Sequence, residues 1–168
     1  MKEITEAEML RKAAIWCSTT ERCVQDVEKK VFAAGLSQEA ADRIIERLKK
    51  EKFLDESRFV HAFTHDKLRF NKWGRVKIGY ELRKRGIAPS LCEAAFEAID
   101  PREYETILTT LLSDKQRQTK GKDQATVTQK LLRFGVSHGF TMEEVFRCLK
   151  RLTNESIDYD HLSEEDWE

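Results

Sequence analysis

The chain has 168 residues and a formal net charge of zero, with 40% hydrophobic and 36% charged residues. Only two prolines and seven glycines interrupt it, which is typical of an all-α protein. No apolar run approaches the ~20 residues of a membrane span, and the acidic stretch MKEITEAEML is unlike a signal peptide. We therefore expect a cytoplasmic protein that makes no contact with membranes.

Cap residues predict where the helices begin. Capping boxes are expected at Thr5 with Glu8 and at Thr141 with Glu144. Asp55 is expected to cap a helix that runs to about residue 72, and Gly74 separates this helix from another over residues 75–85. Further along the chain, Pro89 opens a helix. The next start combines an N-cap, a proline at the first helical position and an acid that closes a box; these are Asp100, Pro101 and Glu103.

Three glycines, Gly35, Gly86 and Gly139, stand where left-handed helix C-caps are expected. Apolar residues recur at fixed offsets from each of them, which indicates a repeated supersecondary unit. Because one such unit buries only a marginal core, neighbours must share surface. The sequence therefore predicts an all-α fold of three tandem three-helix repeats in an elongated, curved array. The alternative is a coincidence among helix-rich segments. The predicted boundaries are 1–53, 54–100 and 101–153, followed by an acidic tail over 154–168.

The helix over 55–72 is expected to carry two parallel stripes. The first is apolar and should face the core; it consists of Phe59, Phe63, Asp66, Phe70 and Trp73. Asp66 interrupts it, and the carboxylate should either pair with Arg75 or Lys77 or reach water at the edge of the stripe. The second stripe, one residue along, is basic or titratable and consists of Arg58, His61, His65, Arg69 and Lys72.

The following helix continues the basic character. Trp73 and Tyr80 lie amid the charge, where they either stack on a ligand or fill a joint between helices. A second basic patch begins near residue 115. We take the candidate partner-binding or DNA-binding residues to be Arg58, His61, His65, Arg69, Lys72, Trp73, Arg75, Lys77, Tyr80, Arg83, Lys84, Arg85, Lys115 and Lys130.

Cofactor chemistry has few candidates. The cysteines show no C-x-x-C spacing and are expected to be reduced core residues; they are Cys17, Cys23, Cys92 and Cys148. His61 and His65 stand at i, i+4, but no third ligand completes a metal site. Phosphate-binding glycine loops and the G-x-S-x-G motif are absent. We expect no catalysis, no metal and no cofactor.

The block KKEKFLDESRFVHAFTHDKLRFNKWGRVKIGYELRKRGI, residues 49–87, resembles the central signature of the RecX family, the bacterial regulators of the RecA recombinase. The likeness rests on Leu54-Asp55-Glu56, on Arg58-Phe59-Val60, on Gly74 and on the run from Lys77-Ile78 to Gly86-Ile87. The block QKLLRFGVSHGFTMEEVFRCLKRL is similar to the C-terminal unit of that family. The resemblance covers about 100 to 150 residues, and the first repeat matches weakly.

The resemblance implies tandem three-helix repeats and binding along the groove of the RecA–DNA filament. There the protein would mostly inhibit ATP hydrolysis, strand exchange and co-protease activity, and would damp recombination, DNA repair and the SOS response. The implied partners are RecA and single- or double-stranded DNA, met directly or through the filament, and a monomer is expected. The alternative is a stand-alone helical DNA-binding protein that acts through phosphate contacts. A helical scaffold for some other partner is a third possibility.

Overall fold

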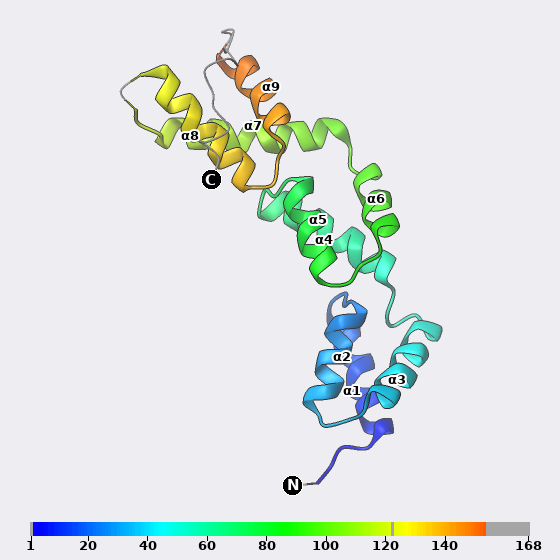
Figure 1. Cartoon of the computed structure of the whole chain (residues 1–168). Helices are drawn as coiled ribbons and strands as arrows, with labels where there is room; N and C mark the ends of the chain where they lie inside the picture. The colour runs from blue at the N-terminus through cyan, green and yellow to red at the C-terminus, as the bar shows by residue number, and fades with distance from the viewer. Residues whose placement is uncertain (1, 122, 154–168) are drawn as a thin grey trace. The chain divides into compact units, whose positions relative to one another are not determined.

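The structure is a computed structural model that describes residues 2–121 and 123–153, and all regular elements within them are α-helices (Figure 1). The all-α class expected from the sequence is therefore confirmed. The acidic tail expected over 154–168 lies outside the described residues. The helices are α1 Glu6–Thr19, α2 Val24–Ala33, α3 Gln38–Lys50, α4 Glu56–Phe70, α5 Arg75–Lys84, α6 Pro89–Glu97, α7 Pro101–Gln118, α8 Gln124–Ser137 and α9 Met142–Thr153.

The chain forms two compact units. The first contains the residues up to Phe63 together with Leu82–Ala95, and the second contains Thr64–Glu81 together with the described residues from Phe96 onward. The division runs within α4 and α5, so each of these helices contributes to both units. The proposed repeats at 1–53, 54–100 and 101–153 divide the same helices into consecutive triplets and stay a proposal.

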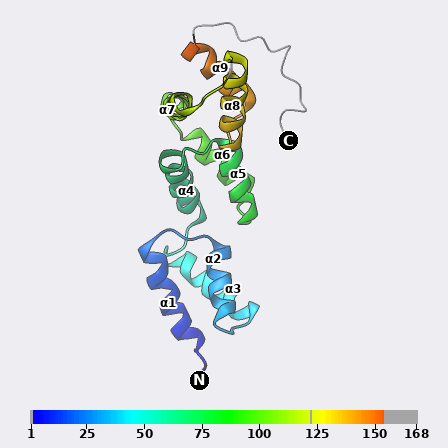
Figure 2. The same ribbon diagram turned by 90° about the vertical axis from the view of Figure 1, so that its left-hand side faces the viewer.

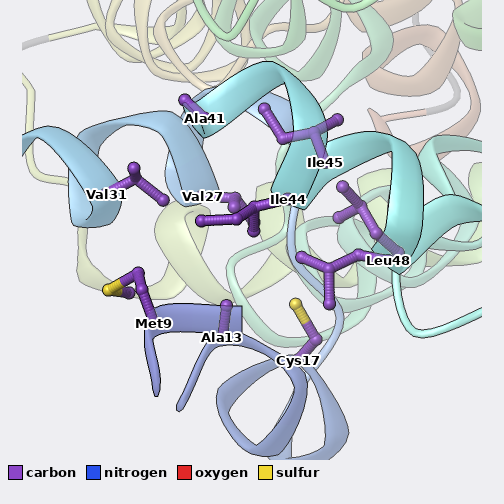
Figure 3. Close-up of a cluster of buried hydrophobic side chains, with 10 residues drawn as sticks. Met9, Ala13, Cys17, Val27, Val31, Ala41, Ile44, Ile45 and Leu48 are labelled. Atoms are coloured by element: carbon purple, nitrogen blue, oxygen red, sulfur yellow. The ribbon is translucent and has the colours of Figure 1, made fainter. Parts of the chain in front are cut away.

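The core of the first unit is built from α1, α2 and α3, which pack on one another. Met9, Val27 and Ile44 are almost fully buried and represent one helix each (Figure 3). The apolar residues of α3 recur at positions 41, 44, 45 and 48, which places them on one face of the helix. Burial of this face holds the triplet together.

The core of the second unit lies among α7, α8 and α9 (Figure 2). Leu112, Leu132 and Val145 are fully buried there. The rings of Tyr104 and Phe140 lie 5.2 Å apart between centroids and fill the end of this core that is closest to the start of α5. The beginning of α5 therefore contacts this aromatic pair through Tyr104.

The predicted caps are largely confirmed. Thr5 and Glu8 exchange two hydrogen bonds of 3.1 Å, and Thr141 and Glu144 form the same box at 3.0 and 3.1 Å. Asp55 accepts a hydrogen bond of 3.1 Å from the backbone N–H of Arg58.

The capping box predicted for α7 is wrong in one respect. Asp100 accepts from the backbone N–H of Arg102 at 2.9 Å, and Pro101 stands at the start of the helix as expected. Glu103, however, pairs with Arg69 and does not close a box. An arginine from a distant segment offers the carboxylate a charged donor, which is a stronger partner than a backbone N–H.

The three glycine turns share one geometry. Gly35, Gly86 and Gly139 have φ values of +88°, +73° and +95°. In each case the following residue donates its N–H to the carbonyl oxygen five positions earlier, at 3.3, 3.1 and 3.2 Å. These are left-handed C-caps of the kind that glycine accommodates without strain. The caps are confirmed, and their equivalence supports the proposed repeats.

The apolar stripe expected on the helix over 55–72 is wrong in its second half. The helix ends at Phe70, whose side chain is 79% exposed. The buried positions are instead Val60, Thr64 and Leu68, with Phe59 beside them. Thr64 is small enough to sit on the core face, so the face passes through a polar position that the pattern of large apolar residues did not reveal.

The end of α4 explains the rest of the discrepancy. Lys72 adopts φ +53°, so the chain leaves the helix before this residue. Asp66 is exposed, and its carboxylate lies 3.8 Å from Nδ1 of His65. The expected pairing with Arg75 or Lys77 is therefore wrong, and the alternative, that the carboxylate reaches water, is confirmed.

Candidate partner-binding surface

The start of α5 is held by the turn between α8 and α9. The N–H of Gly74 donates to the carbonyl oxygen of His138 at 2.7 Å, and the N–H of Val76 donates to that of Gly139 at 3.0 Å. The ring nitrogen Nδ1 of His138 lies 3.1 Å from the carbonyl oxygen of Lys72. The first N–H groups of a helix have no partner within it, so this turn supplies the acceptors that α5 lacks. We call this set of backbone contacts the clasp.

A buried tyrosine completes the clasp. The hydroxyl of Tyr104 accepts a hydrogen bond of 3.1 Å from the N–H of Arg75. The guanidinium of Arg75 also lies over the ring, 4.7 Å from its centroid. Burial raises the pKa of Tyr104 well above its usual value, so the hydroxyl stays neutral. The start of α5 is thus held both by the α8–α9 turn and by Tyr104, and these contacts fix the backbone from which its outer side chains project.

Removing the Tyr104 hydroxyl should weaken the clasp. In a Tyr104→Phe variant the N–H of Arg75 loses its acceptor, and we expect the free energy of unfolding to fall by about 1–2 kcal/mol. Urea unfolding and the exchange rate of the Arg75 amide measure the effect. Tyr80→Phe is the matched control because Tyr80 is exposed. Equal stability of the two variants would contradict the role given to the hydroxyl.

The outer side of α5 within the second unit combines cations with exposed apolar groups. The ammonium groups of Lys67 and Lys77 lie 4.9 and 4.6 Å from the centroid of the half-buried Trp73 ring. Val76 and Tyr80, one turn apart on the same helix, are 56% and 54% exposed. Together these residues define the α5 surface: Lys67, Trp73, Val76, Lys77 and Tyr80. Such a surface offers a partner aromatic, aliphatic and positively charged contacts.

Two arginines of the predicted basic stripe are engaged with carboxylates. Arg58 contacts Glu21 at 2.9 Å, and Arg69 contacts Glu103 at 2.5 Å. The hydrogen bond from Arg69 holds the pKa of Glu103 below its usual range. Both pairs are partly exposed, so each contributes little to stability, but they neutralise charge that was expected to face a ligand. The stripe is therefore less positive than the sequence suggested.

Three more of the predicted cations have structural partners. Arg85 lies 3.4 Å from Asp26, and its guanidinium stands 5.2 Å from the ring centroid of Phe63. Lys115 lies over the ring of Phe134 at 4.8 Å, and Lys130 donates to the carbonyl oxygen of Lys120 at 2.8 Å. These side chains support the fold of the unit to which they belong.

The remaining predicted residues differ in exposure. His61, His65, Arg75, Arg83 and Lys84 are exposed, whereas Lys72 is half-buried in the turn after α4. Of the predicted set, Trp73, Lys77 and Tyr80 belong to the α5 surface as defined above, and the binding role of the whole set stays a prediction. The prediction omitted Lys67 and Val76. Lys67 reaches the Trp73 ring across the turn between α4 and α5, so no helical spacing could have indicated that contact.

The cysteines of the described part of the chain are core residues. All four cysteines are reduced and buried, as expected. Burial raises the pKa of the Cys23 thiol to about 11, and it also raises the pKa of the other three. Across residues 2–121 and 123–153 no cluster of three or more metal-ligating side chains occurs. In the same residues no helix has the length and apolar character needed to span a bilayer.

Comparison with known proteins gives consistent matches. A family model described as RecX, second three-helix domain, matches residues 55–95, the segment that contains the α5 surface. The regulatory protein RecX of Clostridium tetani is 29% identical over 135 residues, or 79% of this chain. That of Prosthecochloris aestuarii is 27% identical over 154 residues, which cover 90% of this chain and 98% of the relative.

The solved structures agree on the fold. The crystal structure of RecX from Lactobacillus salivarius has a TM-score of 0.79 at 15% identity and covers 89% of this chain and 97% of that one. The relatives differ in length, however. The chain spans 60% of the Clostridium tetani protein and 59% of the regulatory protein RecX of Lactobacillus johnsonii.

Proposed function

Because the chain belongs to the RecX family of regulatory proteins, we propose that it regulates the RecA recombinase by binding the RecA–DNA filament. In this proposal it has no catalytic activity and mostly inhibits ATP hydrolysis, strand exchange and co-protease activity of RecA. Its site of action is the cytoplasm, and its effect is to damp recombination and the DNA-damage response.

The α5 surface is the observation that carries the proposal. Interfaces between proteins are enriched in aromatic side chains and exclude water from a central patch. Val76 and Tyr80 are both more than half exposed, so α5 presents two large hydrophobic side chains to solvent one turn apart. Lys67 and Lys77 add positive charge at this patch. The combination suits a protein partner with acidic groups better than it suits bare DNA, which offers few apolar contacts outside its grooves.

A titration of the chain into pre-formed RecA filaments tests the proposal. We expect DNA-dependent ATP hydrolysis by RecA to fall by at least half at substoichiometric amounts of the chain, since a bound regulator blocks many subunits of a polymer. The ATPase rate is the measurement, and the same chain after heat unfolding is the control. An unchanged rate at an excess of folded chain would contradict the proposal.

The alternative of stand-alone DNA binding has its own signature. Binding through phosphates weakens steeply with salt, with a log–log slope of roughly −0.7 to −0.9 per neutralised phosphate. Fluorescence anisotropy of labelled DNA between low and moderate salt therefore separates the two functions. Inhibition of RecA without such a salt-dependent affinity for DNA supports a protein partner.

A further inference from the structure

A groove along α9 in the second unit is not part of the α5 surface. It has a volume of about 460 Å³, and one wall belongs to α7 and the other to α9. Pro101, Tyr104 and Leu108 give it an apolar lining on the α7 side. Arg75 stands at the clasp, while Arg147 and Arg151 line the groove from α9. Three guanidinium groups from two helices thus converge on one apolar groove.

The charge of the groove is mixed but positive on balance. Arg151 pairs with Glu105, and Arg147 contacts Glu143 at 3.0 Å. Both arginines remain more than half exposed. Arg75 stacks on Tyr104 and, within the described part of the chain, has no carboxylate partner. Arginine forks bind carboxylates and phosphates well, so an anionic occupant is indicated.

The glutamates in the wall favour a peptide over a nucleic acid. Glu105 and Glu144 both line the groove. A phosphodiester chain carries a negative charge at every step and would meet these carboxylates with no donor to offer along its backbone. An acidic peptide has a backbone N–H at each residue, which can donate a hydrogen bond to a glutamate. Its carboxylates can pair with the arginines. Its apolar side chains fit the lining formed by Tyr104 and Leu108.

We propose that the groove binds the acidic segment 154–168 of the same chain. This segment, NESIDYDHLSEEDWE, has seven acidic residues, no Lys or Arg, and the apolar residues Ile157, Tyr159, Leu162 and Trp167. Its composition therefore complements both the arginines and the apolar lining. The inference does not depend on the proposed function, because it concerns an intramolecular contact.

The segment is attached close enough to the groove to reach it. The segment follows α9 directly and begins three residues after Arg151. The 12 residues of α9 extend over ~18 Å, whereas the 15 residues of the segment reach up to ~50 Å when extended. The segment can therefore fold back along the whole groove. A short tether of this kind gives an effective concentration in the millimolar range, so a weak site suffices.

Amide hydrogen exchange of the full chain tests the proposal. We expect the amides of 154–168 to exchange at least about fivefold more slowly than in a synthetic peptide of the same sequence. The double variant Arg147→Gln with Arg151→Gln should return them to the rate of the peptide. Arg43→Gln with Arg47→Gln is the matched control, because these arginines of the first unit have similar exposure and are also paired with glutamates. The control variant should keep the slow exchange.

Two results would overturn the proposal. One is exchange at the rate of the peptide in the unaltered chain, and the other is slow exchange that persists in the Arg147→Gln, Arg151→Gln variant. Circular dichroism of each variant verifies that the helices are retained. A third measurement, the fluorescence anisotropy of labelled single-stranded DNA, tests whether a nucleic acid occupies the groove instead of the segment 154–168. If the groove variant alone loses DNA affinity while 154–168 exchanges freely, the groove is a nucleic-acid site and the proposal is wrong.

Discussion

Replacing Gly139 by alanine is expected to lower the free energy of unfolding of the second unit by about 3 kcal/mol. Two effects add. Gly139 has φ +95°, where a side chain costs about 1–2 kcal/mol. A methyl group there would also lie 2.6 Å from the backbone nitrogen of Lys77 and overlap its Cβ. Overpacking of this kind costs about 1–3 kcal/mol, and backbone atoms cannot rotate away.

The chain provides a matched control for this prediction. Gly86 also has positive φ, at +73°, but a Cβ there would meet nothing within 4 Å. Gly86→Ala should therefore cost only the conformational part, about 1 kcal/mol. Gly74→Ala tests the other part alone, since its Cβ would lie 2.6 Å from the backbone nitrogen of Phe140 and overlap the carbonyl group of Gly139. We expect about 2 kcal/mol there.

Urea unfolding followed by circular dichroism gives the three differences, and amide exchange locates them. Exchange at Gly74, Arg75 and Val76 should accelerate in the Gly139→Ala variant, because these N–H groups lose well-placed acceptors. It should stay slow in Gly86→Ala. If Gly139→Ala and Gly86→Ala are equally stable, the close backbone approach does not contribute as described.

The second large effect is functional. The double variant Val76→Glu with Tyr80→Glu should raise the concentration of chain needed for half-inhibition of RecA ATPase at least about tenfold, which corresponds to about 1.4 kcal/mol. The substitutions replace the exposed apolar pair of the α5 surface by charges that repel an acidic partner. The fold should be retained, since glutamate is a good helix former and an acid in the first turn of α5 favours the helix dipole.

Ile15→Glu is the control for this variant. Ile15 is an exposed apolar residue on α1, 68% exposed, outside the segment 55–95. The same kind of substitution there should leave inhibition unchanged. Circular dichroism must show equal helicity in both proteins for the comparison to hold. Equal inhibition by the two variants would exclude the α5 surface as the binding site.

Local sequence chemistry predicted much of the fold. The caps at Thr5, Asp55 and Thr141, and the turns at Gly35 and Gly139, follow from interactions within a few residues, so a single sequence suffices to find them. The C-terminal end of α4 and the face that it buries were harder to predict from the sequence. Thr64 is buried although it is polar, and the helix stops where Lys72 takes a left-handed conformation.

The candidate site was less predictable because its determinants are distant in sequence. Glu21 and Glu103 lie more than 30 positions from the arginines that they neutralise. Nothing near Gly74 indicates that the α8–α9 turn will lie against it. The groove arginines Arg147 and Arg151 look like the ordinary basic end of a helix, and only the packing of α9 on α7 shows that they share a groove.

The clasp also has a consequence for synthesis on the ribosome. When Gly74 has been translated, the turn that supplies acceptors to Gly74 and Val76 is still about 65 residues from being translated. At about 5–20 residues per second, the nascent polypeptide waits for roughly 3–13 s. During that interval the N–H groups of Gly74 and Val76 lack these acceptors, and the start of α5 can reach its final hydrogen bonding only after translation has passed Gly139.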